Sequence, residues 1–343
     1  MILVTGASGL LGSHLLLSLL KKGYQVKALA TAESSISKVL SAFTAYNDED
    51  EKLYAQINWH YGSITDTEFI YDLLADVDYV YHCAAIVSFS PRDIEKMNDT
   101  NTKGTEVLVN MCLLRKVKKF CHVSSVAALG KAGIDEFVTE ETYFVNSPQN
   151  SNYGISKYNA EREVWRASEE GLKIVVVNPS VILGPGNWHS GSSNMFRNSF
   201  KGLKFFSDGI TGFVDVRDVA NIMIHLMEGN VENERFIVCS ENLKYAEVFN
   251  MMHDAFGVRR PYIKATEFMA SLVWRFEKWK SYFTGKQPLI TKETVSAAFQ
   301  QVKFSNEKIK GLLHYQFIPV NKSVQEICEI YTKQSKLPGA LKD

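Results

Sequence analysis

The chain has 343 residues, and its 38 lysines and arginines balance its 38 aspartates and glutamates, so the formal net charge is zero. With 45% hydrophobic and 22% charged residues it has the composition of an ordinary folded protein, which excludes a disordered chain, a collagen or a coiled-coil rod. The length suits one large or two modest domains, and the neutral charge argues against nucleic acid or an anionic membrane as a main partner.

The first elements form a strand, a helix and a second strand. Residues 1–4 are apolar and predict a short buried strand, and residues 10–22 have helical spacing that ends in two lysines and Gly23. Residues 25–30 predict the next strand. Such a βαβ unit implies parallel strands joined by a right-handed crossover.

Further apolar runs of strand length follow at 79–83, 120–123 and 174–177, separated by helical stretches such as 105–115. Near-continuous apolar strands that alternate with helices are typical of a sheet covered on both faces. We therefore expect an α/β fold: a Rossmann-type doubly wound parallel sheet with a smaller, interleaved C-terminal substrate-binding region.

The sequence changes character after Pro179, where a Gly/Ser-rich stretch begins at Gly184. The apolar run 236–239 again predicts a buried strand, so the later region should return to the sheet. We expect an NAD(P)-binding domain at 1–178, with later returns near 213–240, and a mainly substrate-binding α/β region at 179–343. Within it, the helical spacing of apolar residues over 266–284 favours a packed core helix over a membrane-surface helix.

Cysteines and histidines are scattered along the chain. The five cysteines form no Cys-x-x-Cys pair and the histidines have no metal-binding spacing, so neither a disulfide framework nor a metal site is expected. This usage favours a reducing cytoplasm. The sequence has no run of about 18 apolar residues, so no membrane span is predicted.

A glycine-rich turn lies between the first strand and the first helix. Its spacing is Gly-x-x-Gly-x-x-Gly, with Gly6, Gly9 and Gly12. Backbone amides and the positive end of the helix at such a turn can face the pyrophosphate of a dinucleotide. The residues assigned to this contact are Gly6, Ser8, Gly9, Leu10, Leu11 and Gly12.

The end of the second strand bears on the choice between NAD and NADP. An acid at the strand tip would bind the adenosine ribose hydroxyls and repel a 2′-phosphate, but residues 29–35 read Leu-Ala-Thr-Ala-Glu-Ser-Ser, with no acid at the tip itself. Thr31, Ser34, Ser35 and Lys38 can instead hold a phosphate. The sequence therefore favours NADP(H), with NAD(H) remaining possible.

Tyr153 and Lys157 are four residues apart, which places them on one face of a helix. An ammonium close to a phenol lowers the phenol's pKa toward neutral pH, so the pair suits proton transfer. Ser124 and Ser125 follow the strand at 120–123, at the edge where doubly wound sheets bind ligands. We choose Ser125 as the hydroxyl that donates to a substrate carbonyl oxygen.

Taken together, these motifs resemble an extended short-chain dehydrogenase/reductase of the NAD(P)-dependent epimerase/dehydratase superfamily, and are most similar to its dihydroflavonol-reductase-like branch. The resemblance runs nearly from end to end. Its motifs are the glycine turn, His82-Cys83-Ala84-Ala85, Asn101-Thr102-Lys103-Gly104-Thr105, His122-Val123-Ser124-Ser125, Tyr153 to Lys157, Asn178-Pro179-Ser180, Gly184-Pro185-Gly186, residues 214–220 and residues 304–308.

The resemblance implies that Ser125, Tyr153 and Lys157 are catalytic and that Asn101 supports the active-site water and the lysine. It also suggests a homodimer formed through the helix that carries Tyr153, with a monomer as the alternative. The further cofactor contacts that it implies are Ser63, Ile64, Ala84, Ala85, Val123, Pro179 and Val181, in addition to Tyr153 and Lys157.

Two positions depart from the family pattern. Ser63-Ile64 stands where many members have Asp-Ile or Asp-Leu against the adenine, which weakens a polar contact. Asn178 stands where many members have arginine. We expect neither change to abolish cofactor binding.

These observations predict an NADP(H)-dependent oxidoreductase that reduces a carbonyl of a small organic substrate, in the manner of dihydroflavonol 4-reductase. One alternative is an NAD-dependent nucleotide-sugar epimerase or dehydratase, but Thr211 and Gly212 occupy a segment where such relatives usually carry arginine. A second is a non-catalytic NADP-binding regulator, although such proteins often lose the tyrosine or the lysine. Trp188 and His189 are candidate substrate contacts.

Overall fold

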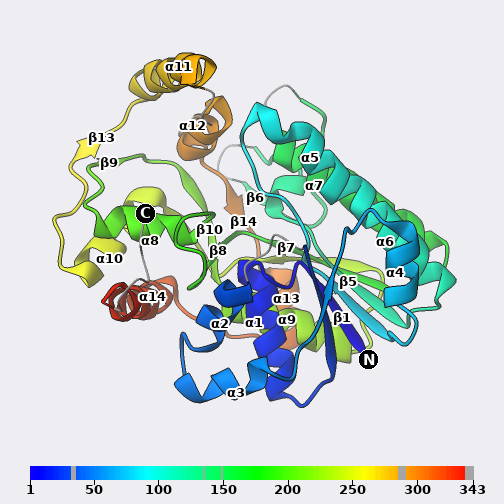
Figure 1. Cartoon of the computed structure of the whole chain (residues 1–343). Coiled ribbons are helices and arrows are strands. Elements are labelled where there is room, and N and C mark those ends of the chain that lie inside the picture. Colours follow the sequence, from blue (N-terminus) through cyan, green and yellow to red (C-terminus); the bar gives the residue numbers. More distant parts are fainter. Residues whose placement is uncertain (32–35, 134–135, 148–149, 285–290, 337–343) are drawn as a thin grey trace.

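The computed structural model describes residues 1–31, 36–133, 136–147, 150–284 and 291–336. A seven-stranded parallel sheet with the order β11-β7-β5-β4-β1-β2-β3 forms its centre (Figure 1). The strands are β1 (Ile2–Thr5), β2 (Val26–Ala30), β3 (Asn58–Tyr61), β4 (Tyr79–His82), β5 (Lys119–Val123), β7 (Ile174–Pro179) and β11 (Glu234–Val238).

Helices cover both faces of this sheet, because neighbouring residues of each buried strand point to opposite sides. In β1, Ile2 and Val4 belong to a core shared with α1 (Leu10–Lys21) and α9 (Val216–Glu228). Leu3 belongs to the core on the other face, with α4 (Thr67–Leu73), α6 (Gly104–Leu114) and α7 (Asn152–Glu169). The predicted doubly wound α/β fold is therefore confirmed.

The sequence interpretation passed over one strand of this sheet. β3 lies at the edge, and its side chains are exposed or half-buried, so it has no apolar run that would reveal it. The predicted return of the later sequence to the sheet is confirmed, since β11 pairs with β7 and places Phe236 opposite Val177.

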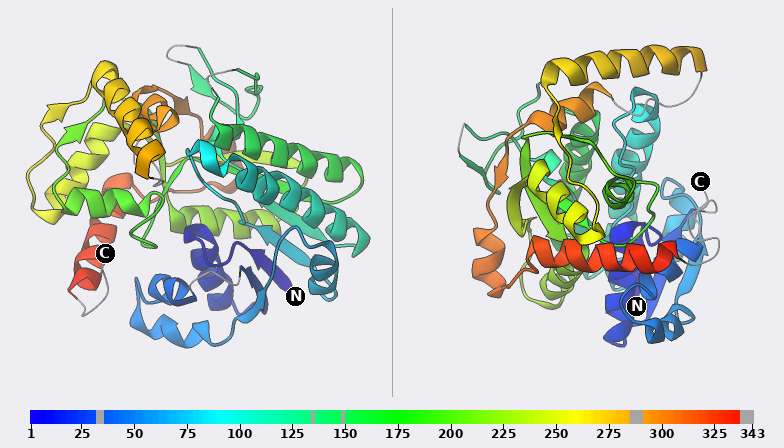
Figure 2. Two further views of the ribbon diagram at one scale, coloured as in Figure 1. Left: turned by 45° about the horizontal axis from the view of Figure 1, so that its top comes forward. Right: turned by 90° about the vertical axis from the view of Figure 1, so that its left-hand side faces the viewer.

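The later part of the chain forms a second layer beside the carboxyl edge of the sheet. A small sheet of order β12-β10-β8 packs with α8, α10 and α14 around a core that includes Phe196, Phe213 and Tyr331 (Figure 2). These elements are β8 (Val181–Leu183), α8 (Ser193–Phe200), β10 (Ile210–Asp215), β12 (Glu241–Lys244), α10 (Tyr245–Phe256) and α14 (Val320–Ser335).

Two carboxylates join α9 to the end of the chain. Asp215 caps α9 by accepting a 2.8 Å hydrogen bond from the Arg217 amide, and it accepts another of 2.6 Å from the Ser323 hydroxyl. Asp218 accepts from the Tyr315 hydroxyl and the Ile318 amide. Both carboxylates therefore hold the junction of β10 and α9 to the later chain.

One predicted core helix proves to be exposed. α11 (Glu267–Thr284) packs against α12 (Lys292–Phe299) at the margin of the molecule, where Phe276 and Trp279 are 63% and 66% exposed (Figure 2). The prediction of a packed core helix is thus wrong: the spacing identified the helix but not what lies over it. None of the helices in the described part of the chain has the length and apolarity that crossing a bilayer requires.

Short elements complete the described chain. They are α2 (Ile36–Phe43), α3 (Glu51–Tyr54), α5 (Ile94–Asn98), β6 (Phe137–Val138), β9 (Phe205–Phe206), β13 (Ile263–Lys264), β14 (Lys303–Phe304) and α13 (Glu307–Leu313).

Candidate active site

The glycine turn connects β1 to α1 and lies against the residues that follow β4. Gly6 has a φ of +64°, and a Cβ built on it would lie 2.5 Å from the amide nitrogen of Ala84. A Cβ on Gly12 would lie 2.2 Å from the carbonyl oxygen of Gly6. Only glycine fits these close approaches. The turn can therefore pack tightly against both the start of α1 and the residues after β4.

The amino end of α1 is open to an anion. Its N-cap residue, Gly9, supplies no side-chain acceptor and is exposed, and the first turn of α1, all of which is described, contains no acidic residue. The first amides of a helix and its dipole then face solvent. Together with the tight backbone of Gly6 and Gly12, this end fits the pyrophosphate of a dinucleotide.

The other predicted cofactor contacts follow the ends of successive strands. Thr31 is exposed after β2, Ser63 is exposed after β3, and Ile64 is buried against Gly104. Ala84 and Ala85 follow β4, and the amide of Ala84 donates to the Thr5 hydroxyl at 3.3 Å. Because the strands are parallel, these positions lie along one edge of the sheet.

Many family members have an aspartate at position 63 that contacts the adenine. The Ser63 hydroxyl that stands here instead is already hydrogen-bonded within its own loop. The Ser63 hydroxyl lies 2.7 Å from that of Thr65 and accepts from the Thr65 amide. The two serines predicted to hold a 2′-phosphate, Ser34 and Ser35, lie outside the described residues, and Lys38 lies in α2.

Ser125 and Tyr153 meet at the carboxyl end of β5. Ser125 caps a short 3-10 turn by accepting from the Ala127 amide at 3.1 Å, and its side chain is hydrogen-bonded to the Tyr153 phenol. The ring of Phe89 packs edge-on against Tyr153, with their centroids 6.2 Å apart. The neighbouring Ser124 turns the other way and donates to Glu161 at 2.6 Å.

Lys157 lies one helical turn beyond Tyr153 and is buried. Its ammonium donates to the Val123 carbonyl at 2.6 Å, which ties α7 to the end of β5. Burial lowers the pKa of Lys157 to about 8, a shift that the charge of Glu161 opposes.

The phenol of Tyr153 does not follow the expectation that Lys157 lowers its pKa. Burial raises the pKa of Tyr153, and the hydrogen bond with Ser125 opposes this rise only in part. The physical reason is desolvation of the phenolate, which disfavours the charged form of a buried acid.

Glu161, one further turn along α7, is the buried carboxylate behind these groups. It accepts hydrogen bonds from the Ser124 hydroxyl, the Asn178 amide at 3.0 Å and the Trp165 indole at 3.2 Å. The guanidinium of Arg235 on β11 completes the set at 3.2 Å. Although position 178 is not arginine, a cation from the neighbouring strand reaches this carboxylate.

Asn101 lies in a π-helical turn, Asp99–Lys103, and is buried. Its side-chain oxygen accepts from the Ile86 amide at 2.7 Å, and its amide nitrogen donates to the Ile86 carbonyl and to the Ser156 hydroxyl, each at 3.0 Å. The side chain therefore fixes the segment after β4 to α7. Its role in supporting a catalytic water and Lys157 stays a prediction.

The second layer approaches the glycine turn through the segment after β8. A Cβ on Gly186 would lie 2.9 Å from the Leu10 side chain at the start of α1. Pro179 ends β7 and Val181 begins β8, so both predicted backbone contacts lie at this junction.

Of the two candidate substrate contacts, Trp188 is corrected by the structure. It is 5% exposed, packs against Phe196 and Tyr331, and donates from its indole nitrogen to Gln334. Trp188 is thus a core residue of the second layer, whereas His189 beside it is exposed.

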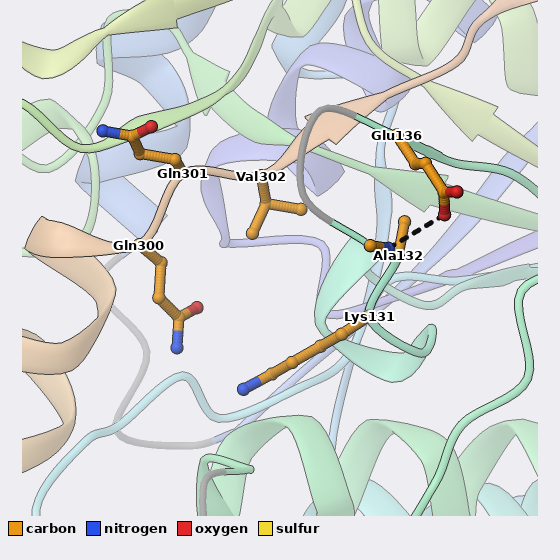
Figure 3. Close-up of a pocket in the computed structure, with 7 residues that line it drawn as sticks. Lys131, Ala132, Glu136, Gln300, Gln301 and Val302 are labelled. Carbon is orange, nitrogen blue, oxygen red and sulfur yellow. Dashed lines mark hydrogen bonds between the residues drawn. The ribbon is translucent and has the colours of Figure 1, made fainter.

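A surface pocket lies between the segment that follows β5 and the segment between α12 and β14 (Figure 3). Lys131 and Gln300 extend into the space between these segments, and Glu136 accepts from the Gly133 amide at 3.0 Å. None of Ser125, Tyr153 and Lys157 lines this pocket.

Sequence reasoning missed three residues that shape the site: Glu161, Phe89 and Arg235. Glu161 had a signal, because it continues the four-residue spacing of Tyr153 and Lys157 by one more turn. Phe89 and Arg235 had no such signal in the sequence, because the fold brings them to the site from distant parts of the chain.

Comparison with known proteins places this geometry in context. Residues 2–239 match the model of the NAD dependent epimerase/dehydratase family. Sterol demethylase protein B of Methylococcus capsulatus is 28% identical over 271 residues, which cover 76% of this chain and 75% of that protein. A putative dihydroflavonol 4-reductase of Synechocystis is 26% identical over 315 residues, covering 89% of this chain and 87% of that protein.

Solved structures share the fold. A UDP-glucose 4-epimerase from Thermotoga maritima, crystallised with UDP-glucose, superimposes with a TM-score of 0.78 at 21% identity. The match covers 98% of this chain and 99% of that one.

The turn geometry predicts that Gly6→Ala lowers both stability and NADPH affinity. Strain at positive φ and the backbone clash together should cost about 2–4 kcal/mol. Gly23→Ala is the matched control, because Gly23 also has positive φ (+81°) but no atom within 4 Å of its Cβ position. It should cost about 1 kcal/mol and leave NADPH binding unchanged. Urea unfolding and calorimetric titration measure both; equal losses in the two variants would contradict the close approach.

Proposed function

The chain belongs to the NAD dependent epimerase/dehydratase family, and from that premise we propose that it is an NADP(H)-dependent oxidoreductase that reduces a carbonyl of a small organic molecule. The observation that carries the proposal is the meeting of Ser125, Tyr153 and Lys157 at one edge of the sheet. The uncapped start of α1 lies at that same edge. A nicotinamide cofactor supplies the hydride in this family; the protein binds, orients and moves protons.

Tyr153 is the proton donor in this proposal. Because burial raises its pKa, the phenol keeps its proton at neutral pH, which suits donation to a carbonyl oxygen that is gaining negative charge. The Ser125 hydroxyl, already bonded to the phenol, is placed to orient the same oxygen.

Lys157 supplies positive charge beside the reacting groups. It holds α7 against β5 through the Val123 carbonyl and offers its remaining donors to a cofactor ribose. Asn101 keeps the segment after β4 and α7 in place, and from that position it would support a water and Lys157 and so help to relay protons.

The preference for NADP(H) rests on the end of β2. Thr31 is exposed there, and the sequence has no acid at the strand tip to repel a 2′-phosphate, the first acid after β2 being Glu33. The similarity to the putative dihydroflavonol 4-reductase of Synechocystis supports reduction as the direction of the reaction. That protein is named as a reductase, and the match covers 89% of this chain.

The experiment that tests the function is a titration with NADPH and NADH, preceded by an absorbance spectrum of the purified protein. Selective, reversible NADPH binding and NADPH consumption with a panel of aldehydes and ketones support the proposal. NAD that survives purification would contradict it and favour a nucleotide-sugar epimerase or dehydratase. Binding without turnover on any carbonyl compound would favour a regulator.

Tyr153→Phe should lower kcat about 10²–10⁴-fold while the affinity for NADPH stays near that of the wild type, because only the phenolic proton is removed. Tyr158→Phe is the matched control on the same helix, since Tyr158 stacks on Phe144. Steady-state kinetics and NADPH titration separate the effects. An unchanged kcat in Tyr153→Phe would remove Tyr153 from the mechanism.

The pKa of Lys157 predicts a loss of activity at alkaline pH. As the pH rises through about 8, the free enzyme loses the charge on Lys157, so kcat/KM for NADPH should fall. Lys157→Met should have a low kcat/KM without this alkaline limb. A wild-type profile that stays flat to strongly alkaline pH would contradict the assignment.

Thr31→Asp should shift the preference toward NAD(H), because a carboxylate at the end of β2 repels a 2′-phosphate and accepts from ribose hydroxyls. The ratio of NADPH to NADH affinity should fall on the order of tenfold. Thr266→Asp is the control, because exposed Thr266 accepts from the Met269 amide before α11, where aspartate serves equally. An unaltered ratio in Thr31→Asp would place the adenosine ribose elsewhere.

A further inference from the structure

The outer face of α11 is apolar and exposed. Phe268, Leu272, Phe276 and Trp279 follow helical spacing along one face, and they are 71%, 53%, 63% and 66% exposed. Met269 and Val273 widen the same face. Figures 1 and 2 show α11 as a long helix at the margin of the molecule, with α12 beside it.

The opposite face of α11 anchors the helix to the protein. Ala270, Trp274 and Glu277 are half-buried and Ser281 is buried. The Ser281 carbonyl accepts a 3.1 Å hydrogen bond from the guanidinium of Arg92, which follows β4. The apolar outer face is therefore presented by a docked helix.

Basic side chains border this face. Arg275 and Lys280 are exposed on its two sides. Arg275 donates to the Ser271 carbonyl at 3.0 Å, and Lys280 is paired with Glu277. Over its whole length α11 has three basic and two acidic residues, a surplus of one positive charge.

We propose that α11 is a docking surface for an anionic lipid bilayer, with the helix lying in the plane of the interface. Phenylalanine, leucine and tryptophan would enter the boundary between headgroups and acyl chains, while Arg275 and Lys280 meet lipid phosphates. The helix rests on the bilayer and does not cross it, in agreement with Glu277 and Ser281 on its inner face.

A second copy of the chain fits this face less well. The helix spans about 27 Å and its outer face is about 10 Å wide, so pairing two such faces covers far less than the roughly 800 Å² per partner of a stable interface. Two-fold pairing would also bring together two helices that each carry a surplus of positive charge. An anionic surface satisfies both the apolar face and its charge.

This proposal is independent of the reductase assignment. It departs from the expectation, drawn from the net charge, that no membrane is a partner, because that expectation averages the charge over the whole chain.

Co-sedimentation of the full chain with vesicles tests the proposal. The vesicles contain phosphatidylcholine alone or phosphatidylcholine mixed with phosphatidylglycerol. We expect binding to the mixed vesicles, with a blue shift of tryptophan emission that Trp279→Phe reduces. Phe276→Ser/Trp279→Ser should weaken binding about tenfold or more, and Arg275→Ser/Lys280→Ser should do so on the order of tenfold.

Matched controls come from other exposed positions. Leu114→Ser/Val145→Ser removes two apolar side chains that are 64% and 71% exposed, and Lys118→Ser/Lys322→Ser removes two exposed cations. Both should bind like the wild type, and all variants should keep the wild-type melting temperature because the changed side chains lie at the surface.

Three results would overturn the proposal. The first is a wild-type chain that binds neither vesicle at low salt. The second is binding that the α11 variants and the controls lose equally. The third is a concentration-dependent dimer that Phe276→Ser/Trp279→Ser dissociates in the absence of vesicle binding, which would make a second copy the occupant.

Discussion

The buried carboxylate of Glu161 joins the helix that carries the reactive side chains to the strands behind them. A carboxylate removed from water is costly unless charge and hydrogen bonds replace its hydration. Here Ser124 from β5's end, Asn178 from β7 and Arg235 from β11 all supply that replacement. The same contacts turn Ser124 away and leave Ser125 facing Tyr153, so the geometry of the candidate catalytic residues depends on Glu161.

Much of this arrangement can be predicted from the sequence, because it follows from local spacing. The four residues between Tyr153 and Lys157 fix a shared helix face, and the apolar run before Ser125 fixes its place at the end of a strand. Sheet order does the rest, since parallel strands bring their carboxyl ends to one edge. Arg235 is different: it reaches Glu161 only because β11 pairs with β7 in one register.

Trp188 and Trp279 show why burial is harder to predict than secondary structure. Both are tryptophans in the later part of the chain, yet Trp188 is in a core and Trp279 is in solvent. The difference is made by Tyr331 and Gln334 on α14, which cover Trp188 from far along the sequence. Trp279 on α11 is 66% exposed. Periodicity reports which side chains share a face, not which distant segment covers it.

The position of β11 in the sheet affects how the chain folds during its synthesis. The last strand of the central sheet is made only after β8, α8, β10 and α9 have been synthesised, and until then β7 is an edge strand whose six residues are all apolar or uncharged. An unprotected strand of that kind invites pairing with other chains. A chain that ended at residue 178 would therefore expose the edge of β7. During synthesis, this edge needs protection from aggregation until residue 238 has left the ribosome and β11 can pair with β7.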